Sequence, residues 1–392
     1  MLNVGVLVGG RSVEHEVAVI TAMQMIENLD KSKYNIIPIY IDNKGKWLVG
    51  NGFEKFETYK KGDFSMGKEV FINPSYGDKT LYVINKKTTS KGLFSKGEDV
   101  EQLEKFATLD VAVLGLHGTN SEDGTIQGLL DTMGIPYTGG DVLASSVGMD
   151  KVLMKDVYEH NNIPVVNYMW FYRDEWTEDE NLVISKIENL NYPLMVKPSN
   201  LGSSIGISKA TNKEELINAV NIAINYDEKI IIEEAIENVR EINCAVLGRN
   251  EDLITSVLEE PIGWKDIQSF ENKYSKDGGA SRRIPAEVSD EVKKEIEELA
   301  KKAFKVINCS GTARIDFLLE NDKKVYVNEI NTLPGSTSYH LWDKAGIDFK
   351  SLMDKLIDIA LKNEEEKQKN MVTFKSDLYL KTSYGTKGSS VK

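Results

Sequence analysis

The stretch GTARIDFLLENDKKVYVNEIN, residues 311–331, decides the fold of this chain. It holds two apolar runs rich in β-branched residues that meet at the turn NDKK, which predicts an antiparallel pair of strands. Polar side chains interrupt both runs. Because side chains alternate along a strand, Glu329 and Asn331 share one face of their strand, and Arg314 and Asp316 share a face of theirs.

These polar positions favour a metal site. Buried carboxylates are costly unless they are paired or bound to a cation. Two acids and an amide on neighbouring strands, Asp316, Glu329 and Asn331, therefore suggest Mg²⁺ held by few protein ligands together with nucleotide phosphates. The other interpretation places the same side chains on the solvated face of an antiparallel pair. The shared faces favour the metal.

A second candidate site lies upstream in YPLMVKPSNLGSSIGISKA, residues 192–210, where two β runs are joined by a loop of Gly and Ser. Lys197 ends the first run, and Gly202, Ser203, Ser204 and Gly206 follow it. Glycines allow the backbone to approach phosphate oxygens, and successive N–H groups form an anion cradle. A hairpin that only uses glycine to turn explains the pattern equally well. Neither GxxxxGK[ST] nor GxGxxG occurs in the chain.

The surrounding sequence alternates helical and strand patterns. Glu233 and Glu234 interrupt an apolar strand at residues 229–236, and Glu241 follows in the next strand. Such carboxylates can read an adenine edge and ribose hydroxyls, although an ordinary edge-strand acid is the better interpretation without context. We expect helices over residues 143–160, 213–224, 289–307 and 349–361, and a polar frayed tail after residue 363.

The N-terminal part predicts a parallel sheet. A strand at residues 3–8, the break Gly9-Gly10 and a helix through residues 17–26 come first, and strands at 36–41 and 109–116 and a helix at 126–133 follow. Residues 43–108, rich in Lys and Gly with short strand-like pieces, are interpreted as an irregular insertion. Glu14 and His15 follow the glycine turn, and His117 with Glu122 follows the third strand, at the edge where open α/β sheets bind ligands.

Composition narrows the functional class. The chain has 392 residues, 48 Lys+Arg and 61 Asp+Glu, giving a formal charge of −13 that disfavours nucleic acid as a partner. No apolar run approaches the roughly 20 residues that span a bilayer, and the start lacks an export signal, so we expect a cytoplasmic protein without a membrane partner. Cys244 and Cys309 lack metal-ligand spacing and are interpreted as reduced core thiols.

Seven motifs in order, GGRSVEHEV, LHGTNSEDGT, GMDKVLMK, VKPSNLGSS, ENKY, ARIDFLLE and NEINTLPG, resemble the series of the D-alanine:D-alanine ligases of the ATP-grasp superfamily. The resemblance covers residues 1 to about 362. It implies an α/β and α+β protein, an ATP-grasp fold preceded by a Rossmann-like N-terminal domain. The domains it implies are 1–140 with the insertion at about 43–108, a central subdomain 141–227, a C-terminal subdomain 228–362, and a polar tail 363–392.

The resemblance also implies an activity: two D-alanines are joined through an acylphosphate, with ATP as cosubstrate, for peptidoglycan precursor synthesis. ATP binding is implied for Lys151, Lys197, Gly202, Ser203, Ser204, Glu233, Glu234, Ile236, Glu241 and Lys273. Two Mg²⁺, or Mn²⁺, are implied at Asp316, Glu329 and Asn331. Catalytic roles are implied for Glu14, Ser203, Tyr274, Arg314 and Gly335. Substrate binding is implied for Glu14, His117, Glu122, Arg314, His340 and Leu341. A homodimer is implied as well.

Two departures from the family pattern leave the acceptor open. One is the loop before and after ENKY, which carries Phe270 where a tyrosine is common and adds Arg282 and Arg283. The other lies after NEINTLPG. Where the family has a serine for the acceptor carboxylate, this chain reads PGSTSYHLW and places His340 at or beside that position. A histidine is larger and can be cationic, so the acceptor is D-alanine, D-serine or another nucleophile. Tyr274 argues, by resemblance, against ester formation. A nucleotide-binding regulatory protein without turnover is the alternative from another class, and the intact lysine and acid set argues against it.

Overall fold

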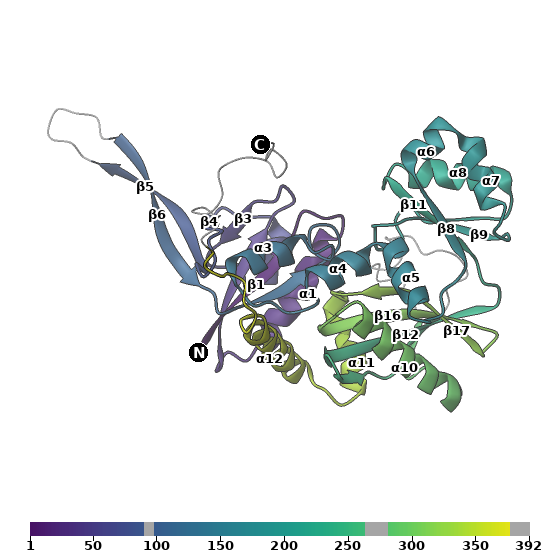
Figure 1. The fold of residues 1–392 in the computed structure, drawn as a ribbon. Helices are drawn as coiled ribbons and strands as arrows, with labels where there is room; N and C mark the ends of the chain where they lie inside the picture. Colours follow the sequence, from purple (N-terminus) through teal and green to yellow (C-terminus); the bar gives the residue numbers. More distant parts are fainter. Residues whose placement is uncertain (90–97, 263–280, 377–392) are drawn as a thin grey trace, which may run out of the picture.

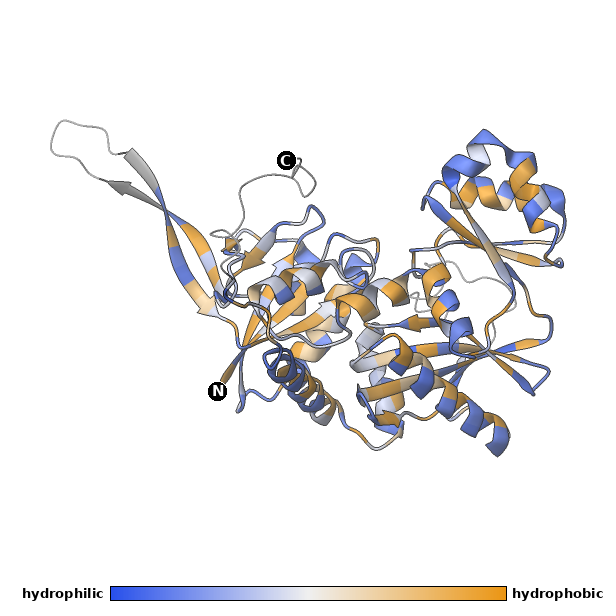
Figure 2. Ribbon diagram, viewed as in Figure 1, coloured by the Kyte–Doolittle hydropathy of each residue, from blue (hydrophilic) through white to orange (hydrophobic). Residues whose placement is uncertain are grey.

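The computed structural model describes residues 1–89, 98–262 and 281–376. Figure 1 shows three α/β units along one chain: an N-terminal sheet with a projecting hairpin, a central unit capped by helices, and a C-terminal unit between them. Figure 2 shows the strands at the centre of the sheets hydrophobic, whereas the long helices α10 and α12 carry hydrophilic outer faces. In the described part of the chain, none of the helices has the length and apolar character to cross a membrane.

The N-terminal sheet contains the predicted parallel core. β1 pairs in parallel with β2 on one side and with β7 on the other. The elements are β1 (Leu2–Gly9), α1 (His15–Asn28), β2 (Tyr34–Ile41), β7 (Val111–Leu116) and α3 (Thr125–Met133). The carboxyl ends of β1 and β7 lie side by side, because Gly9 is in register with Leu116. The loops after these two strands therefore meet at one edge.

The interpretation of residues 43–108 as an irregular insertion is wrong. This segment adds four antiparallel strands to the same sheet, in the order β6-β5-β4-β3-β2-β1-β7. Its elements are β3 (Trp47–Val49), α2 (Phe56–Lys61), β4 (Lys68–Ile72), β5 (Thr80–Thr89) and β6 (Glu98–Thr108). The strand pattern is weak in the sequence because these outer strands bury only one face. Leu81 and Val83 lie in the core, whereas Ile84 on the other face is 41% exposed.

The helix expected over residues 143–160 is two helices, α4 (Val142–Met149) and α5 (Lys151–His160). The break falls at Asp150, whose backbone is extended and whose carboxylate accepts hydrogen bonds from the N–H groups of Val152 and Leu153. The same carboxylate contacts Ser199 Oγ at 2.9 Å and Lys229 Nζ at 2.8 Å. Asp150 therefore caps α5 and ties it to the central unit.

The central unit is a four-stranded antiparallel sheet, β10-β9-β11-β8. Its elements are β8 (Tyr168–Tyr172), α6 (Arg173–Glu178), α7 (Glu180–Ile187), β9 (Leu194–Pro198), β10 (Ser208–Ala210), α8 (Lys213–Ala223) and β11 (Lys229–Glu234). Alternate residues such as Val196, Ile230 and Ile232 pack against the helices. Because strands alternate, Lys197 and Glu233 point to the opposite face, away from α6, α7 and α8.

The C-terminal unit carries the predicted strand pair in the sheet β13-β12-β16-β17. Its elements are β12 (Val239–Arg249), β13 (Asp252–Thr255), β14 (Glu260–Ile262), β15 (Ser281–Arg283), α10 (Asp290–Val306), β16 (Gly311–Glu320), β17 (Lys324–Asn331), the 3-10 helix η1 (Gly335–Ser338) and α11 (Tyr339–Lys344). Ile296, Ala300 and Phe304 of α10 pack against one face, where Ile315 and Phe317 lie. The polar face of β16 and β17 is left for the site.

The last helix, α12 (Phe349–Lys367), continues past residue 363, where a frayed tail was expected. Its residues Leu352, Met353 and Leu356 share a core with Val4 and Val113 of the N-terminal sheet. The hydrophilic end of the helix is held by Lys367, whose Nζ lies 2.5 Å from Asp131 Oδ1. The helix thus returns from the C-terminal unit to the first sheet.

Asp150→Ala is expected to lower the free energy of unfolding by about 2–4 kcal/mol, because it removes a helix cap and leaves Lys229, which is 7% exposed, without its ion pair. Asn212→Ala is the matched control, because Asn212 caps α8 from the surface without an ion pair. It should cost only about 1 kcal/mol. Urea denaturation measures both, and equal losses would contradict the account of Asp150.

Candidate active site

The polar side chains of β16 and β17 lie on one face, as alternation predicts. Arg314 is directly opposite Asn331, and Asp316 is opposite Glu329. The register shifts just beyond this quartet, where Phe317 pairs with Val327 and Asn328 is left as a bulge. The bulge lets Asn328 Oδ1 approach Lys197 Nζ at 3.4 Å. The quartet therefore faces the side of the central sheet on which Lys197 lies.

Asp316 is the buried centre of this quartet. It is 3% exposed and accepts hydrogen bonds from Arg314 Nε at 2.6 Å, Arg314 Nη2 at 2.8 Å and Asn331 Nδ2 at 3.1 Å. Burial raises the pKa of Asp316 even though Arg314 opposes the shift. The solvated-face interpretation is therefore wrong for this carboxylate.

Across from the quartet, Glu233 is buried between two lysines. Its carboxylate lies 2.6 Å from Lys197 Nζ and 3.1 Å from Lys155 Nζ. Burial alone would raise the pKa of Glu233, but the two lysines lower it to about 2. Burial lowers the pKa of Lys155, which has no exposed surface, whereas Glu233 raises that of Lys197 against burial.

Lys151 lies between the Gly–Ser loop and the acid quartet. Its Nζ donates to Leu201 O at 2.8 Å and lies 3.6 Å from Glu329 Oε2. Lys151 and Lys155 project from one side of α5, because residues four apart on a helix are neighbours. The two lysines thus reach the same region from the helix that Asp150 fixes.

The Gly–Ser loop reaches the N-terminal unit. Ser203 and Ser204 have left-handed backbones, with φ of 55° and 58°, a conformation that costs of order 1–3 kcal/mol for a residue other than glycine. The Ser203 hydroxyl donates a hydrogen bond to a Glu14 carboxylate oxygen. A Cβ on Gly202 would lie 3.5 Å from the same carboxylate, so the loop backbone is close to Glu14.

His117 and Glu122 meet at the edge of the parallel sheet, as predicted. His117 Nε2 and Thr21 Oγ1 share a hydrogen bond of 2.8 Å, and burial lowers the pKa of the imidazole to about 4. Glu122 accepts from Gly118 N at 2.8 Å and Leu333 N at 3.3 Å. Burial and the nearby charge of Glu14 raise the pKa of Glu122 to about 8. At neutral pH the imidazole is neutral.

His15 belongs to the packing around β2. Its ring bonds to Gly10 O at 2.7 Å and to Tyr40 Oη at 3.2 Å. It therefore stays outside the site that Glu14 borders.

The segment after β17 brings a backbone turn and a histidine to the same region. Ser336, Thr337 and Ser338 are all left-handed, with φ of 50° to 55°, and Ser336 N donates to Thr21 Oγ1 at 3.1 Å. This turn holds Gly335 beside the His117 pair. Leu341 has no exposed side-chain surface and lies in a core, so only its backbone is available to a ligand.

His340 belongs to a charged cluster with Arg282 and with Glu259, the member that the sequence did not indicate. Its Nε2 lies 3.2 Å from Glu259 Oε2 and 3.0 Å from Arg282 Nη1. Arg282 also pairs with Glu259 at 3.0 Å. Glu259 is 2% exposed, and the charge of Arg314 is among the influences that lower its pKa against burial. The cluster therefore adjoins the quartet.

The structure separates the remaining predicted positions. Glu234 bonds to Asn167 and Asn191 at the carboxyl end of β11. Glu241 on β12 is among the charges that raise the pKa of Lys197, after Glu233, and of Arg314, after Asp316. Ile236, which lies between Glu234 and Glu241 in the sequence, is half-buried. Lys273 and Tyr274 lie outside the described residues.

Three residues of the site were missed. Lys155 had a signal, because it follows Lys151 by four positions in GMDKVLMK, a spacing that puts both on one helix face. Asn328 and Glu259 had no such signal. Asn328 depends on a β-bulge and Glu259 on contacts with residues of other elements, and neither feature produces a periodic pattern in the sequence.

The quartet fits a magnesium site by its donor chemistry. Asp316, Glu329 and Asn331 offer two carboxylates and an amide oxygen, the hard ligands that Mg²⁺ prefers, and Mg²⁺ usually completes its shell with water and phosphates. Within residues 1–89, 98–262 and 281–376, no group of three or more His, Cys, Asp or Glu side chains is arranged to hold a metal. A metal at the quartet would thus depend on further ligands from a nucleotide.

Taken together, β9, β11 and α5 supply cations on one side, and β16 and β17 supply acids and Arg314 on the other. The third side is the edge of the N-terminal sheet that carries Glu14, His117 and Glu122. It is joined to the other two sides by the hydrogen bonds from Ser203 to Glu14 and from Leu333 to Glu122. Cations converging with a candidate metal site are suited to a transferring phosphoryl group, and Arg314 is suited to a developing oxyanion.

Comparisons with known proteins agree with this geometry. Residues 3–140 match a family model described as D-ala D-ala ligase N-terminus, and residues 157–358 match one described as D-ala D-ala ligase C-terminus. A D-alanine--D-alanine ligase of Thermosipho melanesiensis is 40% identical over 372 residues, covering 94% of this chain and 96% of the relative.

Solved structures agree as well. The VanG D-Ala:D-Ser ligase from Enterococcus faecalis has a TM-score of 0.77 and 31% identity, covering 92% of this chain and 99% of the other. The D-alanine--D-alanine ligase from Bacillus anthracis complexed with ATP has a TM-score of 0.66 and 26% identity, covering 94% and 100%.

The buried imidazole of His117 predicts a pH dependence of stability. Its pKa is about 4 in the folded chain, whereas the ordinary value is 6.5. The folded state is therefore fully stable with respect to this group above pH 6.5, and it loses stability as the pH falls toward 4, because the buried imidazole resists the proton that the unfolded chain binds. Relative to His117→Gln, the wild type should lose roughly 3 kcal/mol of unfolding free energy across that window. Urea denaturation at several pH values measures it.

His160→Gln is the control, because His160 is exposed on α5. Its pH profile should follow that of the wild type. Parallel profiles for the wild type and His117→Gln would show that the buried imidazole does not resist protonation.

Proposed function

Because the chain belongs to the D-alanine–D-alanine ligase family, we propose that it joins two D-alanines to D-alanyl-D-alanine while ATP is converted to ADP and phosphate. The observation that carries the proposal is the convergence of Lys151, Lys155 and Lys197 with the quartet on the facing strands. We also propose that the dipeptide serves peptidoglycan precursor synthesis and that the enzyme works as a cytoplasmic homodimer, as the family resemblance implies.

The lysines and the Gly–Ser loop bind the triphosphate. Lys151 and Lys197 contact phosphate oxygens, and the N–H groups of Gly202, Ser203 and Ser204 cover them. The base and ribose lie along β11 and β12, where Glu233, Glu234, Ile236 and Glu241 are placed, with Lys273 added from its own loop. Glu233 pairs with Lys155 and Lys197, and nucleotide phosphates share these lysines with it.

Asp316, Glu329 and Asn331 would hold two Mg²⁺, which would supply charge neutralisation at the transferring phosphoryl group. Arg314 keeps the Asp316 carboxylate oriented by two hydrogen bonds, of 2.6 and 2.8 Å. Lys155 and Lys197, the two lysines that pair with Glu233, keep the same region positive.

Glu14 and its neighbours position the donor D-alanine. The Glu14 carboxylate pairs with the donor ammonium, and Ser203, together with Tyr274, ties Glu14 to the loop over the nucleotide. His117, neutral at pH 7, and Glu122 border the donor from the sheet edge. The donor carboxylate then attacks the γ-phosphorus of ATP, which gives the acylphosphate and ADP.

The acceptor amine attacks the acylphosphate carbonyl, and the tetrahedral oxyanion forms within reach of Arg314 and the Gly335 backbone. Collapse of this intermediate expels phosphate and leaves the peptide bond. Cover by the Gly–Ser loop protects the acylphosphate from hydrolysis.

A second acceptor is favoured by His340. Its imidazole is held between Glu259 and Arg282, where family members have a small serine. Leu341 contributes only its backbone here. This cluster offers a donor and an acceptor to an acceptor side chain, so D-serine is the second candidate.

A coupled assay of ADP release with D-alanine as the sole amino acid tests the proposed function. We expect turnover that requires D-alanine and yields one dipeptide per ADP. Absence of turnover that depends on D-alanine would refute the proposal, and higher turnover with added D-serine would favour the second acceptor.

Glu329→Gln is expected to lower kcat by at least about 100-fold, because it removes one of two carboxylates at the metal site without opening the core. Glu320→Gln, at the far end of β16, is the control and should keep near-normal turnover. Steady-state kinetics at saturating Mg²⁺ measures both. Unchanged turnover of Glu329→Gln would remove this residue from the site.

His340→Ser is expected to change the KM for the acceptor about 10-fold and to leave the KM for the donor within about 2-fold, because the cluster contacts only the second subsite. Separate donor and acceptor KM values come from initial rates over a wide range of D-alanine. Equal effects on both constants would argue against this placement of His340.

A further inference from the structure

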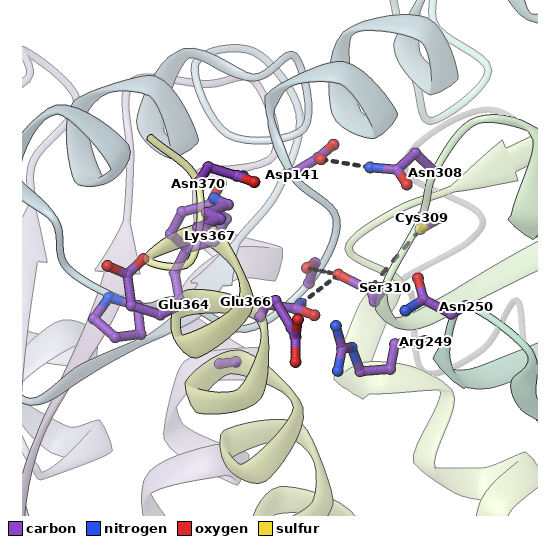
Figure 3. A pocket seen from close by; sticks show the side chains of 15 residues that line it. Asp141, Arg249, Asn250, Asn308, Cys309, Ser310, Glu364, Glu366, Lys367 and Asn370 are labelled. Atoms are coloured by element: carbon purple, nitrogen blue, oxygen red, sulfur yellow. Dashed lines mark hydrogen bonds between the residues drawn. The ribbon is translucent and has the colours of Figure 1, made fainter. Parts of the chain in front are cut away.

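A cavity separate from the proposed active site, but next to it, lies where the N-terminal unit, the C-terminal unit and α12 meet. Its volume is about 420 Å³. Tyr137 and Asp141 line it from the first unit, Arg249 and Asn308 from the C-terminal unit, and Glu364 and Lys367 from α12. Figure 3 shows these walls facing one another.

Arg249 is the unsatisfied group of this cavity. Its Nε is shielded from solvent and has no hydrogen-bond acceptor among the residues that the structure describes. The charge of its guanidinium is felt by Glu366, whose pKa is lowered by Lys369 and, to a smaller extent, by Arg249. Figure 3 shows the side chain pointing from the end of β12 toward α12. A buried donor without an acceptor is costly, so the site favours an incoming oxyanion.

The other charges of the cavity already have partners. Lys367 pairs with Asp131 and lies over the Tyr137 ring at 5.2 Å. Asp141 accepts from Asn308 at 2.8 Å, Glu364 from Gln368 at 3.0 Å, and Glu366 from Lys369 at 2.6 Å. Arg249 therefore keeps a hydrogen-bond donor, its Nε, for a ligand.

The three carboxylates also limit what the oxyanion can be. Asp141, Glu364 and Glu366 repel a multiply charged phosphate, but each carboxylate has acceptor sites left for an ammonium group. A ligand with one carboxylate for Arg249 and one ammonium for the acids matches both demands. The amides of Asn250, Asn308 and Asn363 can in addition read a peptide bond.

We propose that this cavity is a second binding site for an amino acid or short-peptide zwitterion, whose carboxylate is held by Arg249. The site adjoins the floor of the proposed active site. Ser310 Oγ donates to Gly139 O at 3.2 Å, and a Cβ on Gly139 would lie 2.6 Å from Leu333, the residue that bonds to Glu122. An occupant is therefore placed to act as an effector.

Isothermal titration with D-alanyl-D-alanine tests the site, in protein saturated with ADP, Mg²⁺ and a phosphinate dipeptide mimic that blocks the active site. The choice of this probe rests on the proposed function. We expect one dipeptide per chain in the wild type, and at least 10-fold weaker binding in Arg249→Met. Arg173→Met, which removes an exposed arginine on α6, is the control and should bind normally.

Asn250→Asp provides a second variant if Arg249→Met does not fold, because aspartate tolerates the left-handed backbone at this position, where φ is 52°. The added charge beside Arg249 should weaken dipeptide binding about 10-fold. Binding that is absent, that is unaffected by both variants, or that is seen with inorganic phosphate in place of the zwitterion would overturn the proposal. A chain without ligase activity that still binds dipeptide through Arg249 would refute the proposed function alone.

Discussion

The ion pairs of Glu233 with Lys155 and Lys197 are the interaction on which the site depends. All three side chains are buried, and a buried charge without a partner costs several kcal/mol. β11 therefore cannot carry Glu233 unless β9 and α5 bring their lysines to it, and α5 can do so only because Asp150 breaks the preceding helix. One carboxylate thus fixes two strands and a helix around a positive region that suits a polyanion.

A second constraint joins the three units. Ser203 of the central unit bonds to Glu14, and Leu333 and Ser336 of the C-terminal unit bond to Glu122 and Thr21. These contacts meet at the carboxyl edge of β1 and β7. The geometry of any substrate held there depends on the central and C-terminal units as well as on the N-terminal sheet, which explains why the candidate catalytic residues are spread over more than 300 positions of the chain.

Alternation in residues 311–331 predicted the polar face of β16 and β17 and its buried acid, because the period of a strand is two. It did not predict which residues are opposite, because register depends on the Asn328 bulge. The outer strands between residues 43 and 108 were recognised only as short strand-like pieces, because they have one apolar face and many lysines. Lys155 was missed because a lysine on a helix is usually solvated, and only the tertiary position of Glu233 makes this one buried. The family resemblance supplied the roles that pattern alone left open.

A crystal structure with ADP, Mg²⁺ and a phosphinate mimic of the dipeptide tests the central claim most directly. The account predicts ADP phosphates between Lys151 and Lys197, metal ions on Asp316, Glu329 and Asn331, and the mimic between Glu14 and Arg314. A nucleotide bound elsewhere, with these side chains turned away from it, would contradict the account.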